Sequence, residues 1–232
     1  MVIPAPVGIQ YSVALSAPND SVNYDPEKLK ECAGEIISAG CRLYQRGWTP
    51  ATSSNFSMRL NDAACAITVS GRHKGELSAA DVMAVDLDGR PLQDARPSAE
   101  TLLHVRLYRR DPDIGAVLHT HSMAATLLTR QRPAASVTFR GYELQKAFCG
   151  EADHESELVF PVFENSQDIP ALARRVDAWM DARGTGHGYL LRGHGIYTWG
   201  RDMSESLRHL EALEYLLECE WRIYCATAGA SS

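Results

Sequence analysis

Three short β-like segments follow one another in the first half of the chain, and they limit the sheet that this chain can form. They cover residues 54–60, 65–69 and 82–87, and the third ends in an Asp88-Gly89 turn signal. Antiparallel strands can be joined by short turns, whereas parallel strands need a crossover connection that is usually helical. The three segments therefore predict a meander of antiparallel strands.

Helical patterns flank and interrupt the β-like segments. Apolar residues recur with helical spacing from Asp25-Pro26 to Gly47, over about 98–110, from Ser122 onward, over 169–180, and from 203 to about 227. Further β-like segments cover 116–121, 159–163 and 189–199. No repeat, linker or shift in composition divides the chain. We therefore expect an N-terminal extension, residues 1–25, and one α/β domain, residues 26–232, with a mostly antiparallel sheet flanked by helices.

Composition and charge narrow the range of partners. The 232 residues are 45% hydrophobic, which is enough to bury a sizeable core, and the net charge is −6. No strongly basic cluster occurs, so we expect neither nucleic acid nor an anionic membrane as the main partner. The chain has no basic leader pattern and no apolar run long enough to span a bilayer, which predicts a cytoplasmic protein. We expect its six cysteines to be buried free thiols.

Three histidines form the strongest functional signal. His119 and His121 stand two positions apart at the end of a β-like segment, so both imidazoles can reach one ion. His194 lies between two glycines, where the backbone can approach a bound ion or substrate closely. Three histidine ligands leave a coordination position open, as in catalytic zinc sites. The pattern predicts a divalent ion of the Zn²⁺ type, although such a site also accepts Fe²⁺, Co²⁺ or Mn²⁺.

A second group of residues suits an anion. Small polar stretches occur where β-like segments end or a helix begins, and backbone N–H groups, hydroxyls and an ammonium group in such turns commonly hold phosphate. The candidate phosphate-binding residues are Ser54, Asn55, Ser70, Gly71, Lys74 and Ser98. Two carboxylates, Glu100 and Glu143, lie in segments that can border the ion and are candidates for proton transfer. Glu100 has an alternative role, because an acidic residue in a first helical turn favours the helix dipole.

Taken in order and spacing, these segments resemble the class II aldolase/adducin family over about residues 26–225. The matching segments are 54–55, 70–75, 97–100, 119–121 and 192–195. The resemblance implies a three-layer α/β/α fold with a central antiparallel sheet, a homotetramer, and one Zn²⁺ per subunit. It also implies His119, His121 and His194 as the ligands of that ion and Glu143 as the acid/base.

Four further segments are most similar to the dehydratases of this family: 98–104, 115–122, 161–165 and 194–200. The resemblance implies a small phosphorylated sugar as substrate, 5-methylthioribulose 1-phosphate, which loses water to give 2,3-diketo-5-methylthiopentyl 1-phosphate in methionine salvage. Glu143 is then expected to protonate the departing hydroxyl, which requires a carboxyl group with a raised pKa. Whether Glu143, Glu100 or a metal-bound hydroxide removes the first proton stays open.

Two other functions fit the same fold. A class II aldolase or an epimerase would act on another ketose phosphate and would need polar partners for more hydroxyls, whereas a methylthio group needs an apolar pocket. An adducin-like scaffold would use the fold for assembly without chemistry. Such a scaffold has no need of three metal-binding histidines and two carboxylates, so we expect an enzyme.

Overall fold

The computed structural model describes residues 22–229, and most of the expected N-terminal extension lies outside this range. The five α-helices are α1 (Pro26–Gln45), α2 (Thr101–Arg110), α3 (Met123–Gln131), α4 (Ile169–Arg183) and α5 (Met203–Gly229). The eight strands are β1 (Asn55–Arg59), β2 (Ala64–Thr68), β3 (Val82–Asp86), β4 (Ala116–Thr120), β5 (Ser136–Phe139), β6 (Leu158–Phe163), β7 (Gly188–Leu191) and β8 (Gly195–Gly200). Residues 22–229 also form three short 3₁₀ helices: η1 (Lys74–Glu76), η2 (Ala79–Asp81) and η3 (Glu143–Ala147).

The strands form one sheet in the order β3-β2-β1-β4-β8-β7-β6-β5. Every neighbouring pair is antiparallel except β6 and β7, which are parallel. The meander predicted from the first three β-like segments is therefore correct. The mostly antiparallel sheet is also confirmed, and its one parallel pair makes it a mixed sheet.

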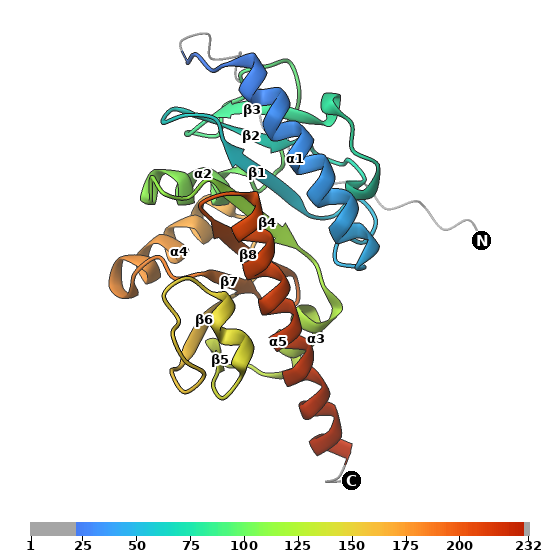
Figure 1. Cartoon of the computed structure of the whole chain (residues 1–232), viewed down its shortest axis with the longest axis vertical. Helices are drawn as coiled ribbons and strands as arrows, with labels where there is room; N and C mark the ends of the chain where they lie inside the picture. Colours follow the sequence, from blue (N-terminus) through green and yellow to red (C-terminus); the bar gives the residue numbers. More distant parts are fainter. Residues whose placement is uncertain (1–21, 230–232) are drawn as a thin grey trace, which may run out of the picture.

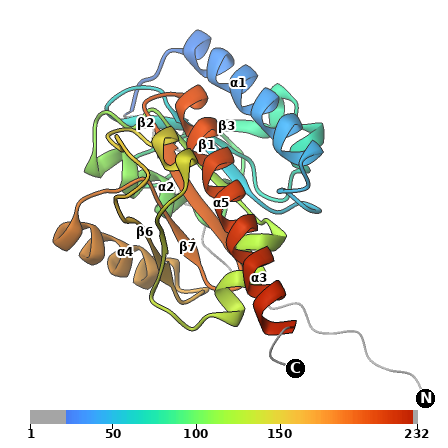
Figure 2. The same ribbon diagram turned by 60° about the horizontal axis from the view of Figure 1, so that its bottom comes forward.

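Helices cover both faces of this sheet, as Figures 1 and 2 show. One hydrophobic core lies between the sheet and α1, α3 and α5, and a second lies between the sheet and α2 and α4. Strand β4 contributes to both cores, because successive side chains point to opposite faces: Leu118 packs in the first core and Val117 in the second. The expected three-layer α/β/α arrangement is confirmed.

Two elements differ from the sequence prediction. The segment 189–199, expected as one strand, forms β7 and β8, joined by a turn in which Gly193 has a φ of +63°. The glycine accommodates this left-handed conformation without the strain that a side chain would introduce. Strand β5 was not predicted, since it has four residues and an apolar pattern too short to separate it from a loop.

The cysteines were expected to be buried free thiols. All six thiols are free; Cys32 and Cys65 are buried, Cys219 is half-buried, and Cys41, Cys149 and Cys225 are exposed. The prediction of buried thiols was therefore wrong for these three, which lie on outward faces or in a loop.

Among residues 22–229, no helix combines the length and the apolar character needed to cross a bilayer.

One carboxyl group is buried beneath the central strands. Glu214 of α5 is 3% exposed, and its Oε1 accepts a hydrogen bond of 3.1 Å from the hydroxyl of Thr120 on β4. Burial disfavours the charged form and raises the pKa of Glu214 to about 8. This residue therefore carries a proton at neutral pH, although a glutamate in an unfolded chain does not.

Replacement of Glu214 by glutamine should reveal this proton in the stability of the protein. Between pH 4.5 and about 8 the folded wild type holds a proton that the unfolded chain has lost, so its free energy of unfolding falls as the pH rises through this window. Glutamine keeps a polar group beside Thr120 but does not titrate. Urea unfolding at pH 5, 6.5 and 8 should show the difference between Glu214→Gln and wild type growing in favour of the variant. A difference that does not change with pH would contradict a raised pKa.

Candidate metal centre

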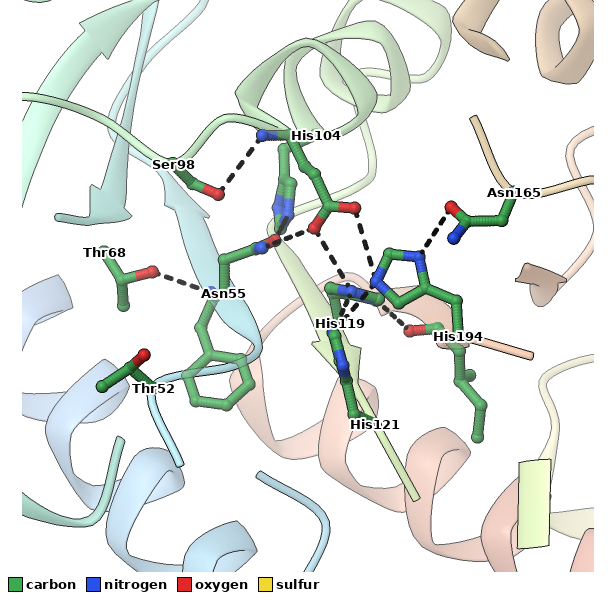
Figure 3. A network of polar contacts seen from close by, with 12 residues as sticks. Thr52, Asn55, Thr68, Ser98, His104, His119, His121, Asn165 and His194 are labelled. Atoms are coloured by element: carbon green, nitrogen blue, oxygen red, sulfur yellow. Dashed lines mark hydrogen bonds and ion pairs between the residues drawn. The ribbon is translucent and has the colours of Figure 1, made fainter. Parts of the chain in front are cut away.

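The three histidines predicted as ligands lie together (Figure 3). His119 is the fourth residue of β4, His121 follows the end of that strand, and His194 lies in the turn between β7 and β8. The Nε2 atom of His121 is 2.8 Å from Nε2 of His119 and 3.1 Å from Nε2 of His194. All three rings thus turn the same nitrogen toward one point.

Hydrogen bonds at the opposite ring nitrogen orient two of these imidazoles. Nδ1 of His119 donates to the carbonyl oxygen of Ile196 at 2.7 Å, and Nδ1 of His194 donates to Oδ1 of Asn165 at 3.1 Å. A neutral imidazole that donates from Nδ1 has a free lone pair on Nε2. Such partners commonly fix the tautomer of histidines that bind metals. No local sequence pattern marks Asn165 as a functional residue, because only the fold brings the segment after β6 beside His194.

The electrostatic environment keeps the rings of His119 and His121 neutral. Burial and the neighbouring His194 hold the pKa of His119 well below its usual range. Burial and the neighbouring His119 lower the pKa of His121 to about 3. Metal binding requires neutral imidazoles, so no proton has to be removed from either ring at physiological pH. The donor set of three nitrogens therefore fits a divalent transition-metal ion of the zinc type.

Packing holds the ring of His119 in place. The ring stacks on Tyr197, its cross-strand partner on β8, with centroids 4.1 Å apart and an interplanar angle of 15°. Next to this pair, a Cβ atom at Gly195 would lie 1.9 Å from the carbonyl oxygen of Thr120 and 3.2 Å from Cε1 of His119. Gly195 therefore allows β8 to approach β4 closely enough for Ile196 to reach His119.

Of the two candidate carboxylates, the structure brings Glu100 to the histidines. Glu100 is the N-cap residue of α2, and one carboxylate oxygen, Oε2, lies 3.3 Å from Nε2 of His119. Its other oxygen lies 3.6 Å from Nε2 of His194. The side-chain amide of Asn55 donates to Oε2 at 2.9 Å. A base at this position is within reach of a substrate molecule held at the histidines.

Glu143 lies elsewhere in the same chain. It begins η3, and its side chain is 75% exposed, with one oxygen 2.7 Å from Nζ of Lys146 and the other 3.9 Å from Nδ1 of His154. The hydrogen bond from Lys146 lowers the pKa of Glu143. The raised pKa expected for Glu143 is therefore wrong for the single chain, because this carboxylate faces solvent and a lysine instead of a dry pocket.

All six predicted phosphate-binding residues line one cavity of about 760 Å³. Glu100 and His121 line the same cavity, so it connects the polar turns with the histidines. The hydroxyl of Ser54 is buried without a hydrogen-bond partner among the described residues. Nζ of Lys74 donates to the carbonyl oxygen of Arg72 at 2.6 Å, and burial lowers the pKa of Lys74 to about 8. Both groups gain from a bound anion, because it would supply the hydroxyl with an acceptor and the ammonium group with a counter-charge.

Asn55 differs from the other five predicted residues. Its amide nitrogen donates to Glu100 and its Oδ1 accepts from Nε2 of His104, so both ends of the amide are engaged within the protein. Asn55 is 4% exposed. Its place in the cavity wall therefore reflects support of Glu100 more than contact with an anion.

Substitution of Gly195 by alanine should weaken metal binding. The added Cβ forces β8 away from Thr120 and takes Ile196 from His119, and loss of such a supporting hydrogen bond typically lowers metal affinity about 10- to 100-fold. Zinc affinity can be measured by competition with a chromophoric chelator, with thermal melting as a test of folding. Gly34→Ala on α1 is the matched control, because a Cβ there meets no atom within 4 Å. Wild-type affinity in a folded Gly195→Ala protein would show that the close approach is not required.

Comparison with known proteins places these features in a family. Residues 34–221 match the model of the class II aldolase and adducin N-terminal domain. A methylthioribulose-1-phosphate dehydratase of Marinobacter nauticus is 55% identical over 199 residues, covering 85% of this chain and 96% of the relative. The enzyme of the same name from Pseudomonas syringae pv. syringae is 55% identical over 190 residues, covering 82% and 93%.

Solved structures show the same fold at lower identity. YgbL of Escherichia coli superposes with a TM-score of 0.71 at 23% identity, covering 83% of this chain and 89% of that one. The L-fuculose-1-phosphate aldolase of Thermus thermophilus gives a TM-score of 0.68 at 23% identity, covering 89% and 98%. With the family model matched over most of its length, this chain belongs to the class II aldolase/adducin family.

Proposed function

We propose that this protein is a metal-dependent lyase that dehydrates 5-methylthioribulose 1-phosphate to 2,3-diketo-5-methylthiopentyl 1-phosphate. The observation that carries the proposal is the cavity in which a histidine triad, the Glu100 carboxylate and an anion-suited wall occur together. The two relatives that are 55% identical and are covered over more than nine tenths of their length bear the name of this activity. We further propose that the reaction belongs to methionine salvage and takes place in the cytoplasm.

The cavity suits a ligand with one charged end and one apolar end. Ser54, Ser70 and Lys74 offer hydroxyls and an ammonium group to a phosphate. Leu102, Ile169 and Pro170 contribute apolar surface to the same cavity. In the proposal, these three receive the methylthio group, for which an aldolase or epimerase substrate has no counterpart.

His119, His121 and His194 would hold the metal ion, which we propose to be one Zn²⁺ per chain. When bound, the ion supplies Lewis-acid polarisation of the substrate's carbonyl and hydroxyl oxygens, which acidifies the neighbouring C–H group. The chain itself orients His119 through Ile196 and His194 through Asn165, and burial keeps the rings of His119 and His121 neutral. No step requires the histidines to exchange protons.

In this proposal, the carboxylates of Glu100 and Glu143 transfer the protons. The reaction removes the proton on carbon 3 and expels the hydroxyl on carbon 4, which leaves as water after gaining a proton. We propose that Glu100 takes the first proton, which is supported by the contacts of its carboxylate with Nε2 of His119 and of His194. Because Glu143 is exposed on its own chain, it would serve as the acid only from another subunit of a homotetramer.

Turnover by zinc-loaded protein tests the function directly. The protein should convert 5-methylthioribulose 1-phosphate to the diketone, lose this activity after treatment with a chelator, and regain it with added Zn²⁺. Formation of the diketone can be followed by mass spectrometry. A metal-loaded protein that instead cleaves or epimerises other ketose phosphates would be an aldolase or an epimerase. Chain without bound metal and without turnover would favour the scaffold function.

Two amide variants should separate the roles of the carboxylates. Glu100→Gln should bind metal and lower kcat by about 10²- to 10⁴-fold, as expected for loss of a general acid or base. Glu143→Gln should have a comparable effect only if this residue acts across subunits. In that case, mixing Glu143→Gln with His119→Ala subunits should restore part of the activity, because some sites combine an intact triad with an intact Glu143. Normal turnover by Glu143→Gln would remove this residue from the mechanism.

A further inference from the structure

A line of buried polar side chains connects Glu100 to the interior between α2 and β1. Glu100, His104 and Tyr108 follow one another at intervals of four residues along α2, and Asn55 and Ser57 are two residues apart on β1. Four residues of helix rise about 6 Å and two residues of strand about 6.7 Å, so the side chains of the two rows have nearly the same spacing. They interdigitate in the order Tyr108, Ser57, His104, Asn55, Glu100.

Every hydrogen bond in this line has a determined direction. The carboxylate of Glu100 accepts from the amide nitrogen of Asn55 at 2.9 Å, which turns Oδ1 of Asn55 toward His104. Because Oδ1 can only accept, Nε2 of His104 must carry the ring proton. Nδ1 of His104 therefore accepts from the hydroxyl of Ser57 at 2.7 Å, and Ser57 accepts in turn from Tyr108 at 2.8 Å.

Burial holds the two ring systems in the forms that this direction requires. His104 has no exposed surface, and burial lowers its pKa to about 4, so the ring is neutral and has one N–H. Burial raises the pKa of Tyr108 well above its usual range, so the phenol keeps its proton. The edge of the His104 ring also packs against Tyr197, which stacks on His119.

We infer that His104 is a positioning residue that holds the amide of Asn55 in the one orientation in which it donates to Glu100. The inference rests on the proposed function, in which Glu100 transfers a proton. Without a donor at Nε2 of His104, the Asn55 amide can turn over and direct its oxygen at the carboxylate. Repulsion between the two acceptors would then move the Glu100 carboxylate away from the histidines.

Three replacements of His104 test this role. His104→Gln can place an N–H near the former Nε2 and should keep most of the activity. His104→Asn retains a polar atom only near the former Nδ1, and His104→Leu retains none. Each of these two should lower kcat about 10- to 100-fold, as expected for losing control of a hydrogen bond to a charged group, while KM changes little and bound metal stays at the wild-type level.

His209→Leu is the matched control, because His209 is also buried, but its ring bonds the backbone carbonyl of Trp199 and takes no part in the line from Tyr108 to Glu100. Its kcat should stay near that of the wild type even if its melting temperature falls. Equal loss of kcat in all three His104 variants and in His209→Leu would overturn the inference. The same holds if the loss in His104→Leu follows loss of metal.

A spectroscopic measurement on the wild type keeps the test independent of activity and of variants that fail to fold. In ¹⁵N–¹H spectra of the zinc-loaded protein with labelled histidine, His104 should appear as a neutral ring with its proton on Nε2. A proton on Nδ1 would overturn the inference. If the expected tautomer is found but the wild type does not dehydrate 5-methylthioribulose 1-phosphate, the proposed function fails and the hydrogen-bonded line stands.

Discussion

The register of the three central strands determines where the functional groups lie. Asn55 on β1, His119 on β4 and Tyr197 on β8 are direct cross-strand partners, and their side chains share the face of the sheet that α2 covers. A shift of β4 by one residue would turn His119 toward α5 and Thr120 toward the cavity, because successive side chains point to opposite faces. The backbone hydrogen bonds of this register thus place His119, the proposed ligand, the Tyr197 ring that stacks on it and the Asn55 amide that contacts Glu100.

Polar side chains are buried on both faces of β4, and each face avoids a buried charge in a different way. On the cavity face, burial keeps the rings of His119 and His121 neutral, and Ile196 fixes the tautomer of His119, so a metal ion can be bound there without prior loss of protons. On the opposite face, Thr120 meets Glu214, whose carboxyl group is protonated at neutral pH because it is buried. Neither arrangement leaves an uncompensated charge in the sheet, which would cost far more than the hydrogen bonds gain.

Most of the fold and much of the site could be predicted from local patterns. The meander, the five helices and the pair His119 and His121 follow from periodicities of two and 3.6 residues, which depend only on nearby sequence. The prediction was less accurate where local pattern carries little information. Strand β5 is short, and the turn before Gly195 separates two apolar segments that were expected to form one strand. The exposed position of Glu143 depends on how a loop packs, which spacing along the chain does not determine.

The sequence by itself determined the types of residue available for chemistry, the strand end that carries two of the histidines, and the membership of the chain in its family. Only the tertiary structure decided which of the two carboxylates contacts the histidines within one chain. It also showed that the Asn55 amide donates a hydrogen bond to Glu100. It also revealed the supporting roles of Asn165, Tyr197 and His104. The physical reason is that these contacts join residues from 19 to 94 positions apart, several of them buried. The sheet register and the docking of α2 decide them, and neither is a local property.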